Sequence, residues 1–336
     1  MADPSTIPLS ALDLAIVADG RTSADALAET TALAQEADRL GYERFWVAEH
    51  HNMATVASTN PPVLVAHLAA VTERIKVGSG GVMLPNHAPL VVAEQFAMLE
   101  ALHPGRIDLG IGRAPGTDPA TAAALRRSAD FDAEDFPRNL IDVMGLLGDA
   151  RSEEGLHTRF RATPTAASSP SVVLLGSSGF SARLAGILGL PFSFAHHFDM
   201  GGTNQASDIY REAFQPSPVL AEPYLIISAS VVVGDTDEEA ERLSAPSRLR
   251  RFGIRTGQQV PLLPPEEARA HPSFAVAVGL PSNAHVGTGD HVVAGLGELV
   301  TETGAQELML FPVAYALEDR VAALTEIANR SEGLAR

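Results

Sequence analysis

Two pairs of adjacent histidines follow short apolar runs in this sequence. Residues 44–48 lead into His50 and His51, and residues 192–195 lead into His196 and His197. Imidazole titrates near neutral pH, so a histidine at the end of a strand is a candidate acid/base group or hydrogen-bond donor. Neighbouring residues of a strand point to opposite faces, and we therefore expect His50 and His51 to have different roles.

Metal ligation is a second interpretation of the same histidines. The four together would suit a metallohydrolase, which usually adds carboxylates at the strand ends, and Glu49 is the one suitable candidate. A third interpretation is structural, with each histidine capping the sheet and its hydrogen bonds satisfied. The sequence has no Cys, which excludes disulfides, thiolate nucleophiles, iron–sulfur clusters and cysteine-based zinc sites.

Two segments carry the residue types that bind a phosphate or a carboxylate. Arg113 follows the apolar run 106–111, at the expected carboxyl end of a strand, where a guanidinium suits either anion. A turn between a predicted strand and a predicted helix is formed by Gly176, Ser177, Ser178, Gly179, Phe180 and Ser181. Such a turn exposes N–H groups and hydroxyls at the positive end of a helix, which predicts a phosphate site. The alternative is that Ser181 is an ordinary N-cap.

Three glycines interrupt the strand expected at residues 75–84, namely Gly78, Gly80 and Gly81. Glycine weakens a strand, so it usually marks a bulge or a place where another group approaches the backbone closely. A planar ring lying against this strand would explain the three glycines. A tight bend in the sheet would also explain them.

Short apolar runs alternate with amphipathic ones, and this alternation predicts the elements that position these groups. Strands are expected at residues 12–17, 44–48, 75–84, 106–111, 172–175, 192–195, 224–233 and 307–311. Helices are expected at residues 24–40, 62–72, 90–102, 119–128, 134–147, 183–188 and 317–328. Eight strands separated by helices favour an α/β fold, the (β/α)₈ TIM barrel with insertions in the βα loops.

A doubly wound open sheet with a small second domain is the other candidate fold. No Gly-x-Gly-x-x-Gly follows the first predicted strand, and this absence argues against the doubly wound fold. We expect residues 1–336 to form a single barrel domain. Residues 244–272 have the least regular pattern, in which Arg248, Arg250, Arg251 and Arg255 are followed by Pro261, Pro264 and Pro265. They are predicted to be either a mobile lid insertion or a disordered surface loop.

Composition limits the partners and the location. The net charge of −17 argues against nucleic acid, because phosphate backbones bind basic surfaces. No apolar run reaches ~18 residues, so no membrane span and no membrane partner are expected. Residues 1–10 lack the basic and apolar regions of a secretory signal. With the absence of Cys, these features predict a cytoplasmic protein.

Several segments together resemble the bacterial luciferase-like, flavin-dependent monooxygenase family, most closely its single-subunit bacterial branch. The matching segments are residues 46–52, 77–87, 105–116, 175–185, 220–224 and 235–240. The resemblance extends from about residue 12 to the last predicted helix. It implies a (β/α)₈ barrel with a flavin at its mouth, in agreement with the strand count.

The resemblance also implies roles for individual residues. His50 matches a histidine that luciferase uses as an acid/base group near the flavin. Gly80 and Gly81 match a bulge under the isoalloxazine ring, where luciferase has a non-prolyl cis peptide. Arg113 matches the arginine that holds the FMN phosphate.

Further matches concern the second half of the barrel. The segment from Gly176 to Ser181 matches a second phosphate loop, with Ser177 and Ser178 as the donors. His196 falls near a tryptophan that lies beside the flavin in luciferase. Luciferase has a cysteine where this chain has Gly112, so light emission is not implied.

The implied reaction is oxidation of a small organic substrate by O₂ and reduced FMN through a C4a-peroxyflavin. Reduced FMN is then a co-substrate supplied by a separate flavin reductase, and the protein is expected to be a homodimer. Three alternatives stay open on sequence alone. They are F420-dependent hydride transfer in the same superfamily, a histidine-based metallohydrolase, and a flavin-binding protein without turnover.

Overall fold

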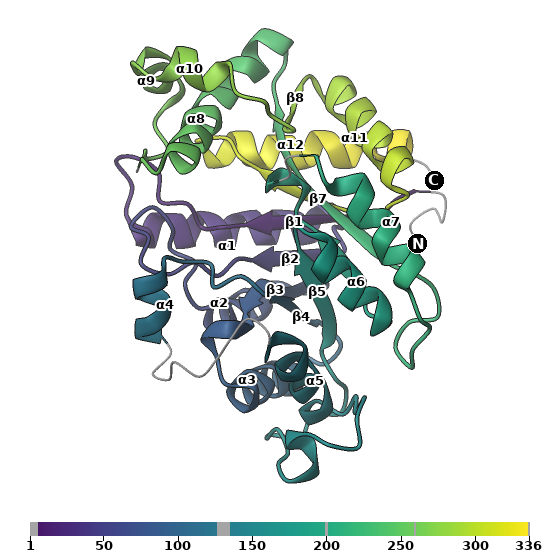
Figure 1. The fold of residues 1–336 in the computed structure, drawn as a ribbon. Coiled ribbons are helices and arrows are strands. Elements are labelled where there is room, and N and C mark those ends of the chain that lie inside the picture. Colours follow the sequence, from purple (N-terminus) through teal and green to yellow (C-terminus); the bar gives the residue numbers. More distant parts are fainter. Residues whose placement is uncertain (1–5, 126–134, 199–200, 259, 335–336) are drawn as a thin grey trace.

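The computed structural model describes residues 6–125, 135–198, 201–258 and 260–334 (Figure 1). Its strands are β1 (Leu9–Asp13), β2 (Arg44–Val47), β3 (Lys76–Met83), β4 (Ile107–Gly112), β5 (Ser171–Gly176), β6 (Phe192–Phe194), β7 (Leu225–Val233), β8 (His285–Gly287) and β9 (Glu307–Pro312). All of these strands pair in parallel.

Eight of the strands close into a barrel. The order β6-β5-β4-β3-β2-β1-β9-β7 returns to its start because β6 also pairs with β7, and β8 pairs with the far end of β7 outside this ring. The predicted (β/α)₈ barrel is therefore confirmed, and the open doubly wound sheet is wrong.

The predicted strands agree with the observed ones except at two places. β1 ends at Asp13, whereas the apolar run extends to residue 17, because the chain turns at Ala15, whose φ is +48°. β8 was not expected, since three residues are too few to show an alternating pattern.

Helices surround the strands (Figure 1). They are α1 (Ser23–Leu40), α2 (Pro61–Ala70), α3 (Pro89–Leu102), α4 (Pro119–Leu125), α5 (Phe136–Leu146), α6 (Gly179–Ile187), α7 (Thr203–Ala213), α8 (Asp237–Thr256), α9 (Pro265–Ala270), α10 (Phe274–Val278), α11 (Gly289–Thr303) and α12 (Leu317–Asn329). Residues 126–128 and 134 of the expected helices lie outside the described residues. Within the described residues, no helix combines the length and the apolar character needed to span a membrane.

Barrel strands alternate between an outward and an inward face, as the period of a strand requires. In β2, Phe45 and Val47 pack outward against the helices, whereas Trp46 packs inward. In β9, Leu308 and Leu310 face outward and Met309 faces inward. This alternation decides which side chains reach the interior of the barrel.

A buried charged cluster occupies the amino-terminal end of the barrel interior. Arg44 Nη1 donates to Asp108 Oδ2 at 2.7 Å, and Arg44 Nε donates to Glu307 Oε1 at 2.7 Å. The Trp46 indole N–H donates to the same Asp108 oxygen at 2.9 Å, and the Tyr224 hydroxyl donates to Glu307 Oε2 at 2.7 Å. The cluster ties β2, β4 and β9 together at the end of the barrel opposite to the carboxyl ends of the strands.

Residues 244–272 are more regular than their sequence pattern indicated. They contain the second half of α8, with Pro246 inside it, and all of α9. Helices α8, α9 and α10 lie together at one side of the molecule (Figure 1) and share a small apolar core that includes Leu249, Phe252 and Ala277. Burial of this shared face explains why the segment is helical. The lid role of this segment and the single-domain organisation stay predictions.

Candidate active site

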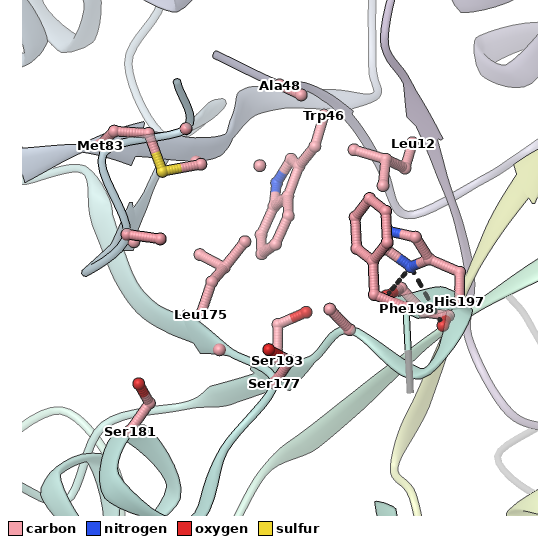
Figure 2. A pocket seen from close by; sticks show the side chains of 18 of the residues that line it. Leu12, Trp46, Ala48, Met83, Leu175, Ser177, Ser181, Ser193, His197 and Phe198 are labelled. Carbon is pink, nitrogen blue, oxygen red and sulfur yellow. Dashed lines mark hydrogen bonds between the residues drawn. The ribbon is translucent and has the colours of Figure 1, made fainter. Parts of the chain in front are cut away.

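A cavity of about 270 Å³ lies at the carboxyl ends of the barrel strands (Figure 2). Every strand of the ring contributes a lining residue. In chain order these are Leu12, Trp46, Gly80, Gly112, Leu175, Ser193, Ser228 and Met309. A barrel places its functional groups at this end, because the loops that follow the strands converge there. We call this space the central cavity.

β2 supplies the floor of the central cavity and one polar group. Trp46, Ala48 and His50 line it, since alternate residues face inward. The Nδ1 atom of His50 is buried and has no hydrogen-bond partner within the described part of the chain. Burial and the nearby charge of Arg250 lower the pKa of His50 more than Glu49 raises it. His50 is therefore neutral at pH 7, with a nitrogen still to be partnered by a ligand.

Glu49 and His51 point away from His50 and form a separate cluster with His87. The Nε2 atoms of His51 and His87 each donate to Glu49 Oε1 at 2.8 Å, and Met83 N–H donates to Glu49 Oε2 at 3.1 Å. Burial raises the pKa of Glu49, but these hydrogen bonds outweigh it and keep the pKa below its usual value. His50 and His51 thus lie in different surroundings, as their alternation predicted, and their roles stay predictions.

The four histidines proposed as metal ligands are not brought together. Among the described residues, the group close enough to share an ion is Glu49, His51 and His87, whose ligand atoms lie within 4.8 Å of one another. Those atoms already hydrogen-bond to each other. The arrangement required for a metallohydrolase using both histidine pairs is therefore not found in the part of the chain that the structure describes.

Arg113 lines the central cavity just after β4. Its guanidinium stacks over the ring of Phe180, with 4.3 Å from Cζ to the ring centroid. No carboxylate or other acceptor bonds to this guanidinium among the described residues. Because Phe180 lies in the first turn of α6, the stacking places the positive charge beside the amino-terminal end of that helix.

The turn between β5 and α6 presents hydroxyls to the same region. Ser178 is the N-cap of α6, but its side chain makes no capping hydrogen bond. Ser177, Ser178 and Ser181 line the central cavity, and Figure 2 shows Ser177 and Ser181 along its β5–α6 side. Ser181 is the third residue of the helix rather than its N-cap. Free hydroxyls, helix N–H groups and an arginine together form an anion site.

The glycines of β3 have a packing reason that does not involve a ligand. A Cβ on Gly81 would lie 2.8 Å from the carbonyl oxygen of Gly110, and a Cβ on Gly80 would lie 3.0 Å from Leu12 Cδ1 and from Trp46 Cβ. Both glycines also line the central cavity, and the peptide bond between them is cis. The close fit of the strand against its neighbours is thus sufficient to require glycine here, while the approach of a ring stays a prediction.

The second histidine pair is arranged differently from the prediction. His197 lines the central cavity, whereas His196 does not; His196 Nδ1 lies 2.7 Å from Thr203 Oγ1. β6 ends at Phe194, and His196–Phe198 form a short 3₁₀ helix that brings both His197 and Phe198 to the cavity. Strand parity could therefore not have identified His197 from the sequence. Gly179 and Phe180 also lie outside the lining, although Phe180 contacts it through Arg113.

Ser228 and Phe198 are among the lining residues that were not predicted. The His197 Nδ1 atom lies 2.8 Å from Ser228 Oγ, and Ser228 Oγ donates to the Phe194 carbonyl at 3.1 Å. The single hydroxyl proton of Ser228 is therefore used, so His197 Nδ1 carries the proton and Nε2 is left as an acceptor. Burial lowers the pKa of His197 to about 4, which keeps the ring neutral at pH 7.

The residues present suit a flavin mononucleotide. The unpartnered guanidinium of Arg113 and the uncapped hydroxyl of Ser178 suit the phosphate, and the apolar walls suit a planar ring system. These walls include Leu12, Trp46 and Leu175 (Figure 2).

Comparison with known proteins shows the family to which this chain belongs. A family model described as luciferase-like monooxygenase matches residues 11–307. A luciferase-like monooxygenase of Escherichia coli (strain K12) is 42% identical over 310 residues, which is 91% of each chain. The N-acetyl-S-alkylcysteine monooxygenase of Bacillus subtilis (strain 168) is 36% identical over 266 residues, or 79% of each chain. The solved structure of apo-MsnO8 superposes with a TM-score of 0.88 at 37% identity and covers 98% of this chain and 100% of that one.

More distant structures share the barrel. One is the oxygenating constituent of 3,6-diketocamphane monooxygenase from Pseudomonas putida in complex with FMN, with a TM-score of 0.71, 20% identity and 98% coverage of each chain. Another is an F420-dependent secondary alcohol dehydrogenase, with a TM-score of 0.65, 17% identity, and coverage of 96% of this chain and 98% of that one. Structural relatives thus bind FMN in one case and use F420 in the other.

Proposed function

We propose that this chain, which belongs to the luciferase-like monooxygenase family, oxidises a small organic substrate with molecular oxygen and reduced FMN. The observation that carries the proposal is Arg113. Its guanidinium stacks at the start of α6 beside an apolar cavity and has no acceptor among the described residues. A bound phosphate would supply that acceptor.

Arg113, Ser177 and Ser178 would hold the phosphate, and the start of α6 would add backbone N–H groups. The apolar side chains of Leu12, Trp46 and Leu175 would line the ring system and keep water from it. When bound, reduced FMN supplies the activation of oxygen, which no amino-acid side chain provides. The protein contributes binding, orientation and exclusion of water.

His50 is the residue that we assign to proton transfer. It lines the central cavity, is neutral at pH 7 and has a buried nitrogen without a partner among the described residues. A neutral imidazole can accept a proton from the substrate or return one to it. His197 is a second polar group in the cavity, and its Nε2 offers an acceptor that orients a donor on the ligand.

The partners in this proposal are a small organic molecule, O₂ and a separate flavin reductase. The reductase and a homodimeric state are expected from the family resemblance. A cytoplasmic location and the absence of nucleic-acid and membrane partners are further expectations from composition. Because a related protein in Bacillus subtilis is named for N-acetyl-S-alkylcysteine, such thioethers belong in the first substrate panel.

The test is to titrate the purified chain with FMN and with F420, and to follow quenching of its single tryptophan, Trp46, which lies in the floor of the central cavity. FMN should bind, and the complex reduced under anaerobic conditions should consume O₂ and yield oxidised substrate. Binding of F420 alone, with hydride transfer and no O₂ uptake, would replace this proposal by the F420-dependent reaction. FMN binding without turnover on any panel member would favour a flavin-binding protein.

A further inference from the structure

A second cavity of about 270 Å³ adjoins the central cavity. The two share Leu14, His197 and Phe198 as lining residues, so these side chains lie at their border. Its outer side is formed by the second half of α8, which contributes Arg248, Arg250, Arg251 and Arg255. We call this space the arginine cavity.

The arginines of this cavity differ in their partners. Arg248 is neutralised, because its Nη2 donates to both carboxylate oxygens of Glu241 at 3.0 and 2.9 Å. Within the described part of the chain, Arg251 donates to neutral acceptors alone, Ser282 Oγ at 3.3 Å and Asn283 Oδ1 at 3.0 Å. Arg250 has neither a hydrogen bond nor an ion pair among the described residues.

Arg250 is also poorly solvated. Burial lowers its pKa, and no acidic neighbour counteracts that effect. No Asp or Glu belongs to the described residues that line the cavity. A buried arginine normally has an anionic partner, because an unpaired charge away from water is costly. In a chain whose net charge is −17, two arginines facing a cavity without a lining carboxylate are unusual.

The rest of the lining shows what kind of anion could occupy the space. Serine hydroxyls near the arginines come from Ser230, Ser244, Ser247 and Ser282. The opposite wall is apolar and includes Ile16, Leu262 and Phe311. A molecule held here would have a charged head against α8 and an apolar body that leads past His197 and Phe198 toward the central cavity.

We propose that the arginine cavity binds the anionic head of the organic substrate, a carboxylate or sulfonate, through Arg250 and Arg251. An arginine guanidinium pairs with such oxygens through two parallel hydrogen bonds. The substrate is then an amphiphilic organic acid whose uncharged part extends to the site of oxidation. This inference rests on the proposed function, because only that function makes the bound anion a substrate. Binding at the arginine cavity can nevertheless be measured without flavin.

The experiment uses the full chain and calorimetric titration with three probes of equal length: octanoate, octane-1-sulfonate and octan-1-ol. The two anions should bind at least about 10-fold more tightly than the alcohol, as expected for a charge-assisted hydrogen-bonded pair. Whichever anion binds more tightly identifies the head group. Equal binding of the alcohol and both anions would overturn the proposal.

Variants assign the effect to the cavity. Arg250→Gln should lose about 10-fold or more in affinity for the anions and none for octan-1-ol, and Arg250→Lys should retain part of the preference. Arg242→Gln is the matched control. It removes the same charge from the same helix, but Arg242 bonds to Glu239 at 2.7 Å and does not line the cavity. An equal loss in both variants, or none in Arg250→Gln, would contradict the proposal.

Two further measurements separate other anions from the substrate. Inorganic phosphate should not displace octanoate, and FMN should bind Arg250→Gln as it binds the unmodified chain. Displacement by phosphate, or a loss of FMN affinity equal to that of Arg113→Ala, would mean that the cavity holds a phosphate and not an organic acid. If octanoate binds through Arg250 while no O₂ is consumed with reduced FMN, the proposed function fails and this anion site stands.

Discussion

At the residue scale, three arginines of this chain differ in whether an acceptor pairs with their guanidinium, and this difference indicates their roles. Arg44 is buried with Asp108 and Glu307 and is fully paired, so it contributes to the fold. Arg113 and Arg250 line two adjoining cavities and have no acceptor among the described residues. Their missing partners are best supplied by ligands, a flavin phosphate in one case and a substrate anion in the other.

The first prediction concerns Arg113. Arg113→Ala should weaken FMN binding by about 10-fold or more, because it removes a charge-assisted contact to the phosphate. The measurement is quenching of Trp46 fluorescence during titration with FMN. Arg183→Ala is the control, since Arg183 is an exposed arginine of α6 that does not line the central cavity. An unchanged dissociation constant for Arg113→Ala would remove the phosphate assignment.

The second prediction concerns His50. His50→Ala should lower kcat by about 10²-fold or more while FMN binding and the urea midpoint stay close to those of the unmodified chain. Since the pKa of His50 lies below its usual value, the acidic limb of the pH–rate profile should fall below pH 6.5 and should disappear in the variant. The exposed His291 provides the control His291→Ala. A normal rate in His50→Ala would count against the catalytic role.

At the element scale, strand parity determines what each strand gives to the site. β2 places Trp46, Ala48 and His50 on the inner face, whereas a short 3₁₀ helix after β6 brings His197 to the cavity. β3 packs so closely against its neighbouring strands that only glycine fits at several of its positions. The site is thus a product of strands that are packed tightly before any ligand binds.

The third prediction tests this close packing. Gly81→Ala should lower the free energy of unfolding of the flavin-free chain by about 1–3 kcal/mol, because the added methyl would meet the backbone of Gly110 at 2.8 Å. Urea denaturation measures it. Gly279→Ala is a matched control, since its nearest neighbour would lie 3.5 Å away. Loss of FMN binding with unchanged stability would show that ring approach alone requires the glycine.

At the scale of the whole molecule, the barrel has a charged cluster at one end and two ligand cavities at the other. The cluster joins residues that are 263 and 64 positions apart in the sequence. Its charged residues lie toward the end of the barrel opposite to the cavities, and Trp46, which bonds to Asp108, links the cluster to the floor of the central cavity. We therefore expect substitution of Arg44 to affect stability first.

The fourth prediction concerns this separation. Arg44→Met should destabilise the chain by about 3–5 kcal/mol, because it leaves the carboxylates of Asp108 and Glu307 buried and unpaired. Arg39→Met, which removes an exposed pair with Glu36, should change stability by less than about 1 kcal/mol. Thermal or urea unfolding of both variants provides the comparison, and equal effects would contradict the structural role of the cluster.

The fifth prediction concerns acid stability. Burial lowers the pKa of His197 and of His285 from the usual 6.5 of an imidazole to about 4. Between these values the unfolded chain binds more protons than the folded one, so the free energy of unfolding should fall as the pH falls from 6.5 toward 4. The loss should be on the order of 1–3 kcal/mol for each ring. The stabilising contribution is fully present above pH 6.5.

Urea denaturation at pH 7, 6 and 5 tests this dependence. The double variant His197→Gln, His285→Gln should have a flatter profile in this window, whereas His291→Gln, on the surface, should retain the original slope. A slope that is the same in all three proteins would show that other groups dominate the acid sensitivity.

The sequence by itself determined the barrel and much of the central cavity. Alternating apolar runs located β2 to β7 and β9 closely, since strand formation depends on a pattern of neighbouring residues. The same local reasoning placed His50, Arg113 and the turn at residues 176–181 at the carboxyl ends of strands, and all three line the central cavity. It chose His196 over His197, because the short 3₁₀ helix that turns His197 into the cavity leaves no periodic pattern in the sequence.

The tertiary structure alone decided which distant groups meet. The sequence did not predict that Arg250 of α8 lines a cavity bordered by His197. It also did not predict that residues 244–272 form helices that pack on a shared core. It also left two explanations for the glycines of β3. The distance from a Cβ on Gly81 to the carbonyl oxygen of Gly110 shows that close packing is sufficient to require glycine there. Local patterns specify strands and helices, whereas contacts between residues far apart in the chain exist only once the barrel has closed and its side chains have packed.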